Sequence, residues 1–229
     1  MLPSAASGAN LLAVAATAQA QQTDEDAART DEIIVTAQKR AQSLQDVPIA
    51  ITALDEKQLE MRGIRTIEDL QYSTPGLTMS ANTLNNSRLI LRGVGAENPV
   101  IGGDPGVSLN MDGHYLQAGS FLTRDLFDIE RIEVLRGPQG TLYGKNTTAG
   151  AINIISRAPS FDPEIMVEGT VASRATYRFR AGLSGPLSDT VAARLSFSQG
   201  EHGGYIRNTI TGRNVNTSSN TSARAQLLF

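Results

Sequence analysis

Four consecutive segments in the last third of the chain alternate apolar and polar residues with a period of two. They begin near Ile165, Tyr177, Val191 and Ala223, and each runs for roughly ten residues, the length of a membrane-spanning strand. Because side chains on a β-strand point alternately to its two faces, each segment predicts a strand with one apolar and one polar face. A half-buried soluble sheet has the same period, so that alternative stays open for any single segment.

The connections between these segments differ in length. Residues 184–189 (SGPLSD) predict a tight turn, whereas residues 201–219 are long and polar. Short turns on one side and long loops on the other match the topology of outer-membrane barrels. Only residues 163–229 remain for such strands, which is enough for about four. Four strands cannot close a barrel, and an open edge in lipid leaves backbone groups unpaired, so we expect the chain to be an N-terminal fragment.

The first twenty residues have features of a secretion signal. Residues 11–18 (LLAVAATA) form a short apolar run, and Ala18, Gln19 and Ala20 give the small-x-small pattern of a cleavage site. The run is too short to span a bilayer. Residues 1–10 contain no Lys or Arg, so the usual charged start is missing and the segment need not be a signal. We expect a signal peptide at 1–20 and no transmembrane helix.

Composition excludes several functional classes. The 229-residue chain has no Cys and a net charge of −3, so it offers no thiolate nucleophile, no Cys-based zinc site and no basic surface for nucleic acid. His114 and His202 are far apart and lack companions at ligand spacing, which favours locally bonded or solvated side chains over metal ligands. No Ser/His/Asp or paired-carboxylate arrangement can be identified by spacing. We therefore expect no metal, no cofactor and no catalytic residue.

A glycine-rich stretch at residues 136–150 (RGPQGTLYGKNTTAG) suggests a comparison with phosphate-binding loops. A Walker-type loop has four residues between its first Gly and the Gly-Lys pair, whereas GTLYGK has three. Asn146 occupies the place of the magnesium-binding hydroxyl, and Pro138 removes a backbone donor. A β-branched segment at 151–156 follows instead of a helix. The glycines are therefore expected to serve tight turns and close approach between strands.

The region between residues 46 and 158 predicts a mixed α and β domain. Asp55 and Gln58 predict the start of a short helix that Gly63 ends, and a second short helix is expected to start at Thr66. A helical turn is expected at 122–127. Strands are expected at 47–52, 88–92, 107–111, 129–135 and 151–156.

A short apolar segment lies in the polar tail that precedes this domain. Residues 21–31 (QQTDEDAARTD) are acidic and lack an apolar period, which is typical of a disordered tether. Residues 31–37 (DEIIVTA) then supply a few β-formers. Such a strand has nothing to pair with inside the chain, so its backbone is available to extend the sheet of another protein. An ordinary first strand of the following domain is an equally good interpretation of the residues alone.

The order of these features resembles a TonB-dependent outer-membrane receptor. The resemblance covers nearly the whole chain and is strongest at 128–156. It implies an α+β plug domain at 46–158, a flexible tether at 21–45, and at 163–229 the first antiparallel strands of a transmembrane barrel of about 22 strands. The matching segments are DEIIVTA (31–37) for the TonB box; VPIAITALDEKQLEMRGIRTIEDLQYSTPGL (47–77), LILRGVG (89–95) and VSLNMDGHYLQ (107–117) for the plug; and DIERIEVLRGPQGTLYGKNTTAGAINIIS (128–156) for the plug's C-terminal signature.

The resemblance also implies a function. A complete receptor would take up a scarce, bulky solute such as an iron–siderophore complex across the outer membrane of a Gram-negative bacterium. Its implied partners are the solute, outer-membrane lipid and the TonB C-terminal domain of an inner-membrane energy-transducing complex. The resemblance favours the docking interpretation of 31–37. A non-transporting remnant, or a soluble periplasmic plug-like binding module, is the alternative function.

The resemblance assigns residues to TonB contact, to solute contact and to the plug signature. TonB contact is expected at Glu32, Ile33, Ile34, Val35, Thr36 and Ala37. Solute contact is expected in outward plug loops at Asn82, Asn85, Asn86, Glu97, Asn98 and Asp104, for which solvated turns are an equally good interpretation. Charged residues among Arg92, Glu130, Arg131, Glu133 and Arg136 could pair across plug and barrel wall, or be solvated. The plug-signature positions are Arg92, Gly93, Asp112, Gly113, Arg131, Glu133, Arg136, Gly137, Pro138, Gly140, Tyr143 and Gly144.

Overall fold

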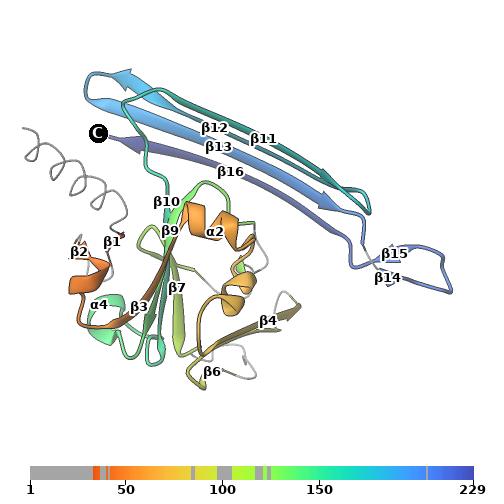
Figure 1. Ribbon diagram of the computed structural model, residues 1–229, viewed down its shortest axis with the longest axis horizontal. Helices are drawn as coiled ribbons and strands as arrows, with labels where there is room; N and C mark the ends of the chain where they lie inside the picture. The colour runs from red at the N-terminus through yellow and green to blue at the C-terminus, as the bar shows by residue number, and fades with distance from the viewer. Residues whose placement is uncertain are drawn as a thin grey trace, which may run out of the picture.

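The computed structural model describes residues 33–36, 40, 42–83, 86–96, 105–116, 121–122, 125–204 and 206–229. It contains a mixed domain, residues 33–157, and a long sheet of four antiparallel strands, residues 164–228. The long sheet lies along one side of the mixed domain (Figure 1). The expected signal peptide and the acidic part of the expected tether, residues 21–31, fall outside the described residues.

The mixed domain is built on a five-stranded sheet in the order β3-β9-β10-β7-β8. Strand β10 pairs in parallel with β7 and antiparallel with β9, and the other two pairings are antiparallel. The expected strand at 107–111 is confirmed, but the one expected at 47–52 starts three residues later. Pro48 has no N–H to give to a ladder, and a short 3-10 helix occupies 44–46. The strands are β3 (Ala50–Asp55), β7 (Val107–Met111), β8 (His114–Leu116), β9 (Ile129–Arg136) and β10 (Gly150–Ser156).

Short helices follow β3. Helix α2 (Glu56–Met61) begins where the Asp55 carboxylate accepts the Gln58 N–H at 2.7 Å, which confirms the expected cap. The second helix, η2 (Glu68–Tyr72), is a 3-10 helix that starts two residues after Thr66. The helical turn expected at 122–127 does not extend to its end. Asp125 forms a β-bridge with Thr66, and the Leu126 N–H bonds to the Arg65 carbonyl instead of to its own segment.

The glycine-rich stretch is a loop with one unpredicted helical turn. Helix α4 (Gly140–Tyr143) lies inside it, although no helix was expected to follow the glycines. The loop is closed by backbone bonds from Gly137 to Ala149 and from Gln139 to Thr147. Gly137, Gly144 and Gly150 all have positive φ, which confirms their expected role in turns and close approach.

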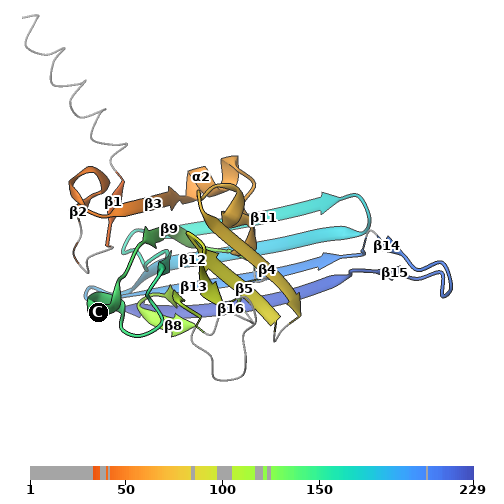
Figure 2. The same cartoon turned by 90° about the horizontal axis from the view of Figure 1, so that it is seen from below.

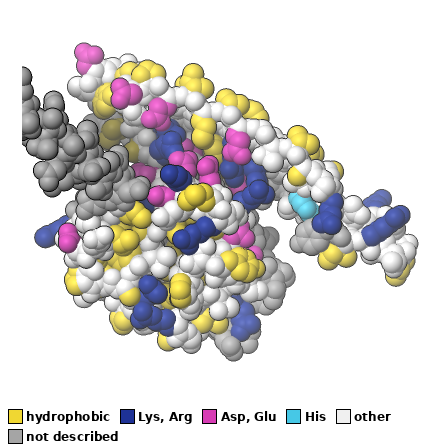
Figure 3. Space-filling view, viewed as in Figure 1, with side chains coloured by type: hydrophobic (Ala, Val, Ile, Leu, Met, Phe, Trp, Pro, Cys, Tyr) yellow, Lys and Arg dark blue, Asp and Glu magenta, His cyan; other side chains and the backbone are white. Residues whose placement is uncertain are grey.

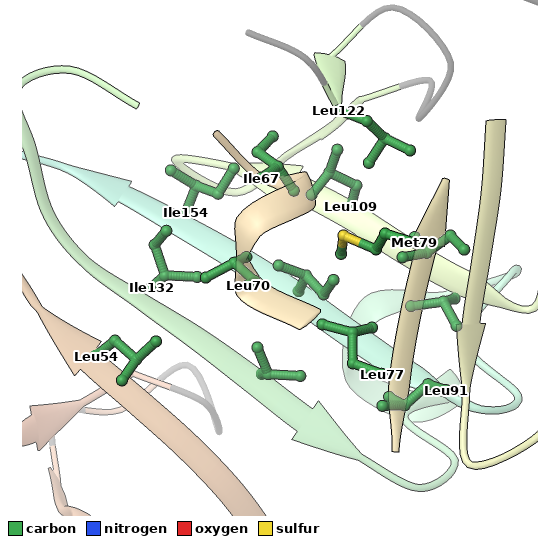
Figure 4. Packing of buried hydrophobic residues seen from close by; sticks show 14 of the residues in the cluster. Leu54, Ile67, Leu70, Leu77, Met79, Leu91, Leu109, Leu122, Ile132 and Ile154 are labelled. Atoms are coloured by element: carbon green, nitrogen blue, oxygen red, sulfur yellow. The ribbon is translucent and has the colours of Figure 1, made fainter. Parts of the chain in front are cut away.

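The main hydrophobic core lies between the five-stranded sheet, the short helices and a second antiparallel sheet (Figure 4). The second sheet contains β4 (Leu77–Thr83), β5 (Asn86–Leu91) and β6 (Val94–Ala96). A smaller cluster covers the opposite face of β9 and β10. Its buried members are Val35, Val47, Ala53, Leu135 and Ala151, so the N-terminal segment covers this second face.

The long sheet confirms the four alternating segments. Its strands are β11 (Glu164–Ala172), β12 (Thr176–Ser188), β13 (Val191–His202) and β16 (Ser218–Leu228), in that order and side by side (Figure 2). The turn expected at 184–189 is shorter than expected, because β12 stays paired through Ser188. The long connection after β13 carries a small hairpin of β14 (Ile206–Arg207) and β15 (Asn214–Val215). Among the described residues, no helix is long and apolar enough to cross a membrane.

The two faces of the long sheet differ in chemistry. Large apolar side chains are exposed on the face that points away from the mixed domain, whereas charged side chains gather between sheet and domain (Figure 3). Such an exposed apolar band is unusual on a soluble protein. Its members are Ile165, Val167, Val171, Tyr177, Phe179, Leu183, Leu195, Phe197 and Leu227.

Candidate functional site

The expected docking segment, of which residues 33–36 are described, does pair inside the chain. Strand β1 (Ile34–Val35) runs antiparallel to β2 (Gln42–Ser43), and the Leu44 N–H bonds to the Ile33 carbonyl at 3.0 Å. The expectation that a strand here has no internal partner is therefore wrong. The partner is polar and only two residues long, so no strand pattern in the sequence indicates it.

Packing fixes the docking segment on the sheet. Val35 is 1% exposed and belongs to the small cluster with Leu135 and Ala151, whereas Ile34 is 45% exposed. Alternate side chains of the segment thus face the sheet and the solvent. The segment is stowed against β9 and β10.

Two charged side chains of β9 hold the end of this segment. The Glu133 carboxylate accepts the Thr36 N–H at 2.7 Å and the Thr36 hydroxyl at 3.2 Å. Arg131 donates to the same Glu133 oxygen at 2.9 Å and to the Thr36 hydroxyl at 3.1 Å. The Glu133 side chain is fully buried. We call Arg131 and Glu133 the Thr36 clasp. Both were expected to pair with the barrel wall or to be solvated, and both instead contact the docking segment.

A buried polar strip lies on the same face of the sheet. Asn110 donates to Ser108 and to Asn153, each at 3.1 Å, and Asn153 donates to the Tyr143 hydroxyl at 2.7 Å. Burial raises the pKa of Tyr143; the hydrogen bond from Asn153 lowers it, and the charge of Glu133 raises it further. The strip and the Thr36 clasp are thus electrostatically linked.

Tyr143 is expected to report on the clasp. The pKa of Tyr143 should lie above its ordinary value because the side chain is buried. It should fall in Glu133→Gln, which removes a charge that raises the pKa, and rise in Asn153→Ala, which removes a hydrogen bond that lowers it. Ultraviolet absorbance of tyrosinate as pH is raised, with Tyr143→Phe subtracted to isolate this residue, measures the shift. Because burial raises the folded-state pKa, the stability that Tyr143 contributes is complete below pH about 10 and declines above it. Equal midpoints in Glu133→Gln and the unaltered chain would contradict the link.

Four signature positions form tight turns. Arg92 and Gly93 connect β5 to β6, and Asp112 and Gly113 connect β7 to β8, all with positive φ. The Asp112 carboxylate also accepts the backbone N–H and the hydroxyl of Ser156, at 2.8 and 2.7 Å. These residues have a structural role in the described part of the chain. Of the other signature positions, Arg136 and Gly137 are partly buried at the end of β9, and Pro138, Gly140 and Gly144 are exposed in the loop.

A buried ion pair joins the mixed domain to the long sheet. Asp128 accepts two hydrogen bonds from Arg194 of β13, at 2.8 Å from Nε and 2.6 Å from Nη2, and a third from the Ser196 hydroxyl. Arg224 of β16 donates to the Asp128 carbonyl at 3.2 Å. The side chains of Asp128 and Arg194 are 0% and 2% exposed. Sequence reasoning missed this contact, although Arg194 and Arg224 lie on the polar face of alternating segments.

A second, more exposed contact lies beside it. Asp125 accepts two hydrogen bonds from Arg180 of β12, at 2.9 and 3.1 Å, and one from Ser198. Arg180 also pairs with the half-exposed Glu168 at 3.3 Å. Polar side chains of three neighbouring strands thus converge on the segment that precedes β9.

The remaining expected site residues fall partly outside the described residues. Asn82 and Asn86 lie in β4 and β5, next to the connection between these strands. Both histidines are locally bonded, as expected: His114 to the Asp112 carbonyl and His202 to the Gly204 N–H. Within the described ranges no group of three potential metal ligands occurs. The expected site residues outside these ranges are Glu32, Ala37, Asn85, Glu97, Asn98 and Asp104.

Comparisons with known proteins agree on one family. The model of the TonB-dependent receptor plug domain matches residues 43–151. The pesticin receptor of Yersinia pestis is 35% identical over 184 residues, which cover 80% of this chain and 26% of that protein. The ferripyoverdine receptor of Pseudomonas aeruginosa is 29% identical over 73% of this chain and 20% of its own length. The chain thus spans about a quarter of the length of these relatives.

A solved structure gives the same result. The ferric yersiniabactin uptake receptor FyuA of Yersinia pestis superposes with a TM-score of 0.70 at 30% identity, over 78% of this chain and 28% of that one. An iron-regulated outer membrane virulence protein of Vibrio cholerae is 33% identical over 75% of this chain and 28% of its own length. The pesticin, ferripyoverdine and ferric yersiniabactin proteins are receptors rather than enzymes. The chain therefore belongs to the TonB-dependent receptors of the Gram-negative outer membrane, and residues 43–151 are its plug domain.

Proposed function

We propose that the complete receptor takes up an iron–siderophore complex across the outer membrane. The observation that carries this proposal is the match, at a TM-score of 0.70 and 30% identity, to a receptor described as taking up ferric yersiniabactin. A ferripyoverdine receptor among the sequence relatives supports the same class of solute. The exposed apolar face of the long sheet counts against the alternative of a soluble periplasmic binding module.

Energy for this uptake is proposed to come from TonB, through strand addition to the docking segment. Ile34, Val35 and Thr36 are β-formers, and backbone pairing with a partner strand would give the grip needed to pull. The Ile33 carbonyl is bonded to Leu44. Because antiparallel partners alternate between bonded and non-bonded pairs, residues 33 and 35 face β2 while residues 34 and 36 face the opposite edge. That opposite edge is where a partner strand would add.

Ile34→Pro in the complete receptor is expected to abolish energised uptake and to leave solute binding unchanged. Proline removes the N–H of residue 34, which lies on the outer edge, while the bond between Ile33 and Leu44 is kept. Uptake of radioactive iron as the siderophore complex by whole cells, and binding of the same complex to de-energised cells, measure the two properties. Ile34→Val, which keeps both the N–H and the β preference, is the matched control. Undiminished uptake by Ile34→Pro would refute TonB docking at this segment.

The solute side of the proposal concerns the plug loops. Contact is proposed at Asn82 and Asn86, near the β4–β5 connection, and in the segment around Asn98 and Asp104. Amide and carboxylate side chains suit polar recognition of a solute.

A further inference from the structure

The open edge of the docking segment is occupied by a side chain of the plug itself. Residues 34 and 36 direct their backbone groups away from β2, toward the edge where a partner strand would pair. The Thr36 N–H on this edge already donates to the Glu133 carboxylate at 2.7 Å. A bond between a backbone N–H and a carboxylate is about twice as strong as a neutral one. A partner strand therefore has to compete with a charged acceptor for this N–H.

We infer that Glu133 guards the pairing edge of the docking segment, so that TonB can add its strand beyond Ile34 only after Thr36 has left the carboxylate. The inference rests on the proposed docking of TonB to residues 33–36. It assigns Glu133 and Arg131 a positioning role on the docking segment, distinct from any contact with solute.

Glu133 lies in a part of the plug that is held in place when the docking segment is pulled. Glu133 lies in β9, which is paired on both sides, with β3 and with β10. The same strand begins directly after Asp128, which is bonded to the long sheet. A pull on the segment therefore separates Thr36 from Glu133 rather than moving the two together.

Arg131 makes this separation reversible. Its Nε donates to Glu133 at 2.9 Å independently of Thr36. Once Thr36 leaves, the buried carboxylate still has a cationic partner, so it is not stranded as an isolated charge. The second carboxylate oxygen of Glu133 is buried without a hydrogen-bond partner among the described residues. The carboxylate thus remains available to take back the Thr36 N–H.

The test compares Glu133→Gln with Glu130→Gln in the complete receptor. Glutamine keeps the shape of Glu133 but offers Thr36 a neutral acceptor. Glu130 also bonds to Arg131, yet it is half exposed and has no bond to Thr36, so it is the matched control. Two quantities are measured: hydrogen exchange of the peptide that contains Thr36, without any partner, and binding of the purified TonB C-terminal domain. Glu133→Gln is expected to speed exchange and to tighten TonB binding by about tenfold, with Glu130→Gln unchanged.

A second variant protects the test against a Glu133→Gln receptor that fails to fold. Thr36→Val keeps the backbone N–H and the β preference but removes the hydroxyl bonds to Glu133 and Arg131. It is expected to change both quantities in the same direction, by a smaller factor. If TonB binds and neither exchange nor affinity changes in these variants, the guard is refuted while TonB docking stands. If exchange is faster but TonB binds no form of the receptor, the proposed docking fails and the guard with it.

Discussion

Gly150→Ala is expected to cost roughly 3 kcal/mol or more of folding free energy. Gly150 begins β10 with a φ of +154°, a conformation that side chains rarely adopt. A Cβ atom there would lie 2.2 Å from the Leu135 carbonyl oxygen and 2.6 Å from a methyl group of Leu91. Leu91 can turn, but Leu135 is backbone in a strand paired on both sides and cannot withdraw.

Alanine substitutions at two other glycines separate the two causes of this lost stability, which are backbone strain at positive φ and overlap of the new Cβ with its neighbours. Gly137 has a φ of +109° and open space at its Cβ position, so Gly137→Ala should show conformational strain alone, about 1–2 kcal/mol. Gly169 has neither restriction, and Gly169→Ala should be close to neutral. Urea unfolding in detergent, followed by fluorescence of the five tyrosines in a chain without Trp, gives the free energies. If Gly150→Ala were no less stable than Gly137→Ala, the backbone of Leu135 would have to leave room for a Cβ atom at position 150.

Features that depend on near neighbours in sequence could be predicted. The Asp55 cap acts over three residues, and the alternation that defines the long sheet is a property of each strand by itself. The close approach at Gly150 was expected in kind, because a glycine at the start of a β-branched run has few other uses. The position of β3 was missed by three residues because the alternating pattern continues across Pro48, where the ladder cannot.

Features that depend on distant partners could not be predicted from one sequence. The docking segment pairs with residues 42–44, which have no strand pattern. In the sequence, Glu133 is one of several charged residues that alternate with apolar residues in β9. Its burial next to Arg131 is explained by the docking segment that packs over it. Arg194 and Asp128 are 66 residues apart in the chain, and each taken alone looks like a solvated charge.

Asp128→Asn is the other change with a large expected effect, a loss of about 3 kcal/mol in the free energy that holds the plug to the long sheet. Asp128 has a φ of +56°, which asparagine tolerates as well as aspartate does, so the substitution removes the charge without changing the backbone. Arg194 would remain 2% exposed with Glu164 as its remaining acidic partner, at 3.1 Å. A buried cation that loses its main partner costs far more than the pair contributed.

The measurement that isolates this pair is a double-mutant cycle of Asp128→Asn with Arg194→Gln, by urea unfolding in detergent. The double variant should be more stable than the sum of the single losses predicts, because it leaves no unpaired buried charge. Glu168→Gln breaks the pair of a half-exposed carboxylate with Arg180 and should cost less than about 1 kcal/mol. Additive losses in the cycle would mean that the Asp128–Arg194 pair does not hold the plug to the long sheet. A strong coupling would instead mean that the start of β9 is fixed to the long sheet at Asp128. A pull on the docking segment would then separate Thr36 from Glu133 instead of moving β9.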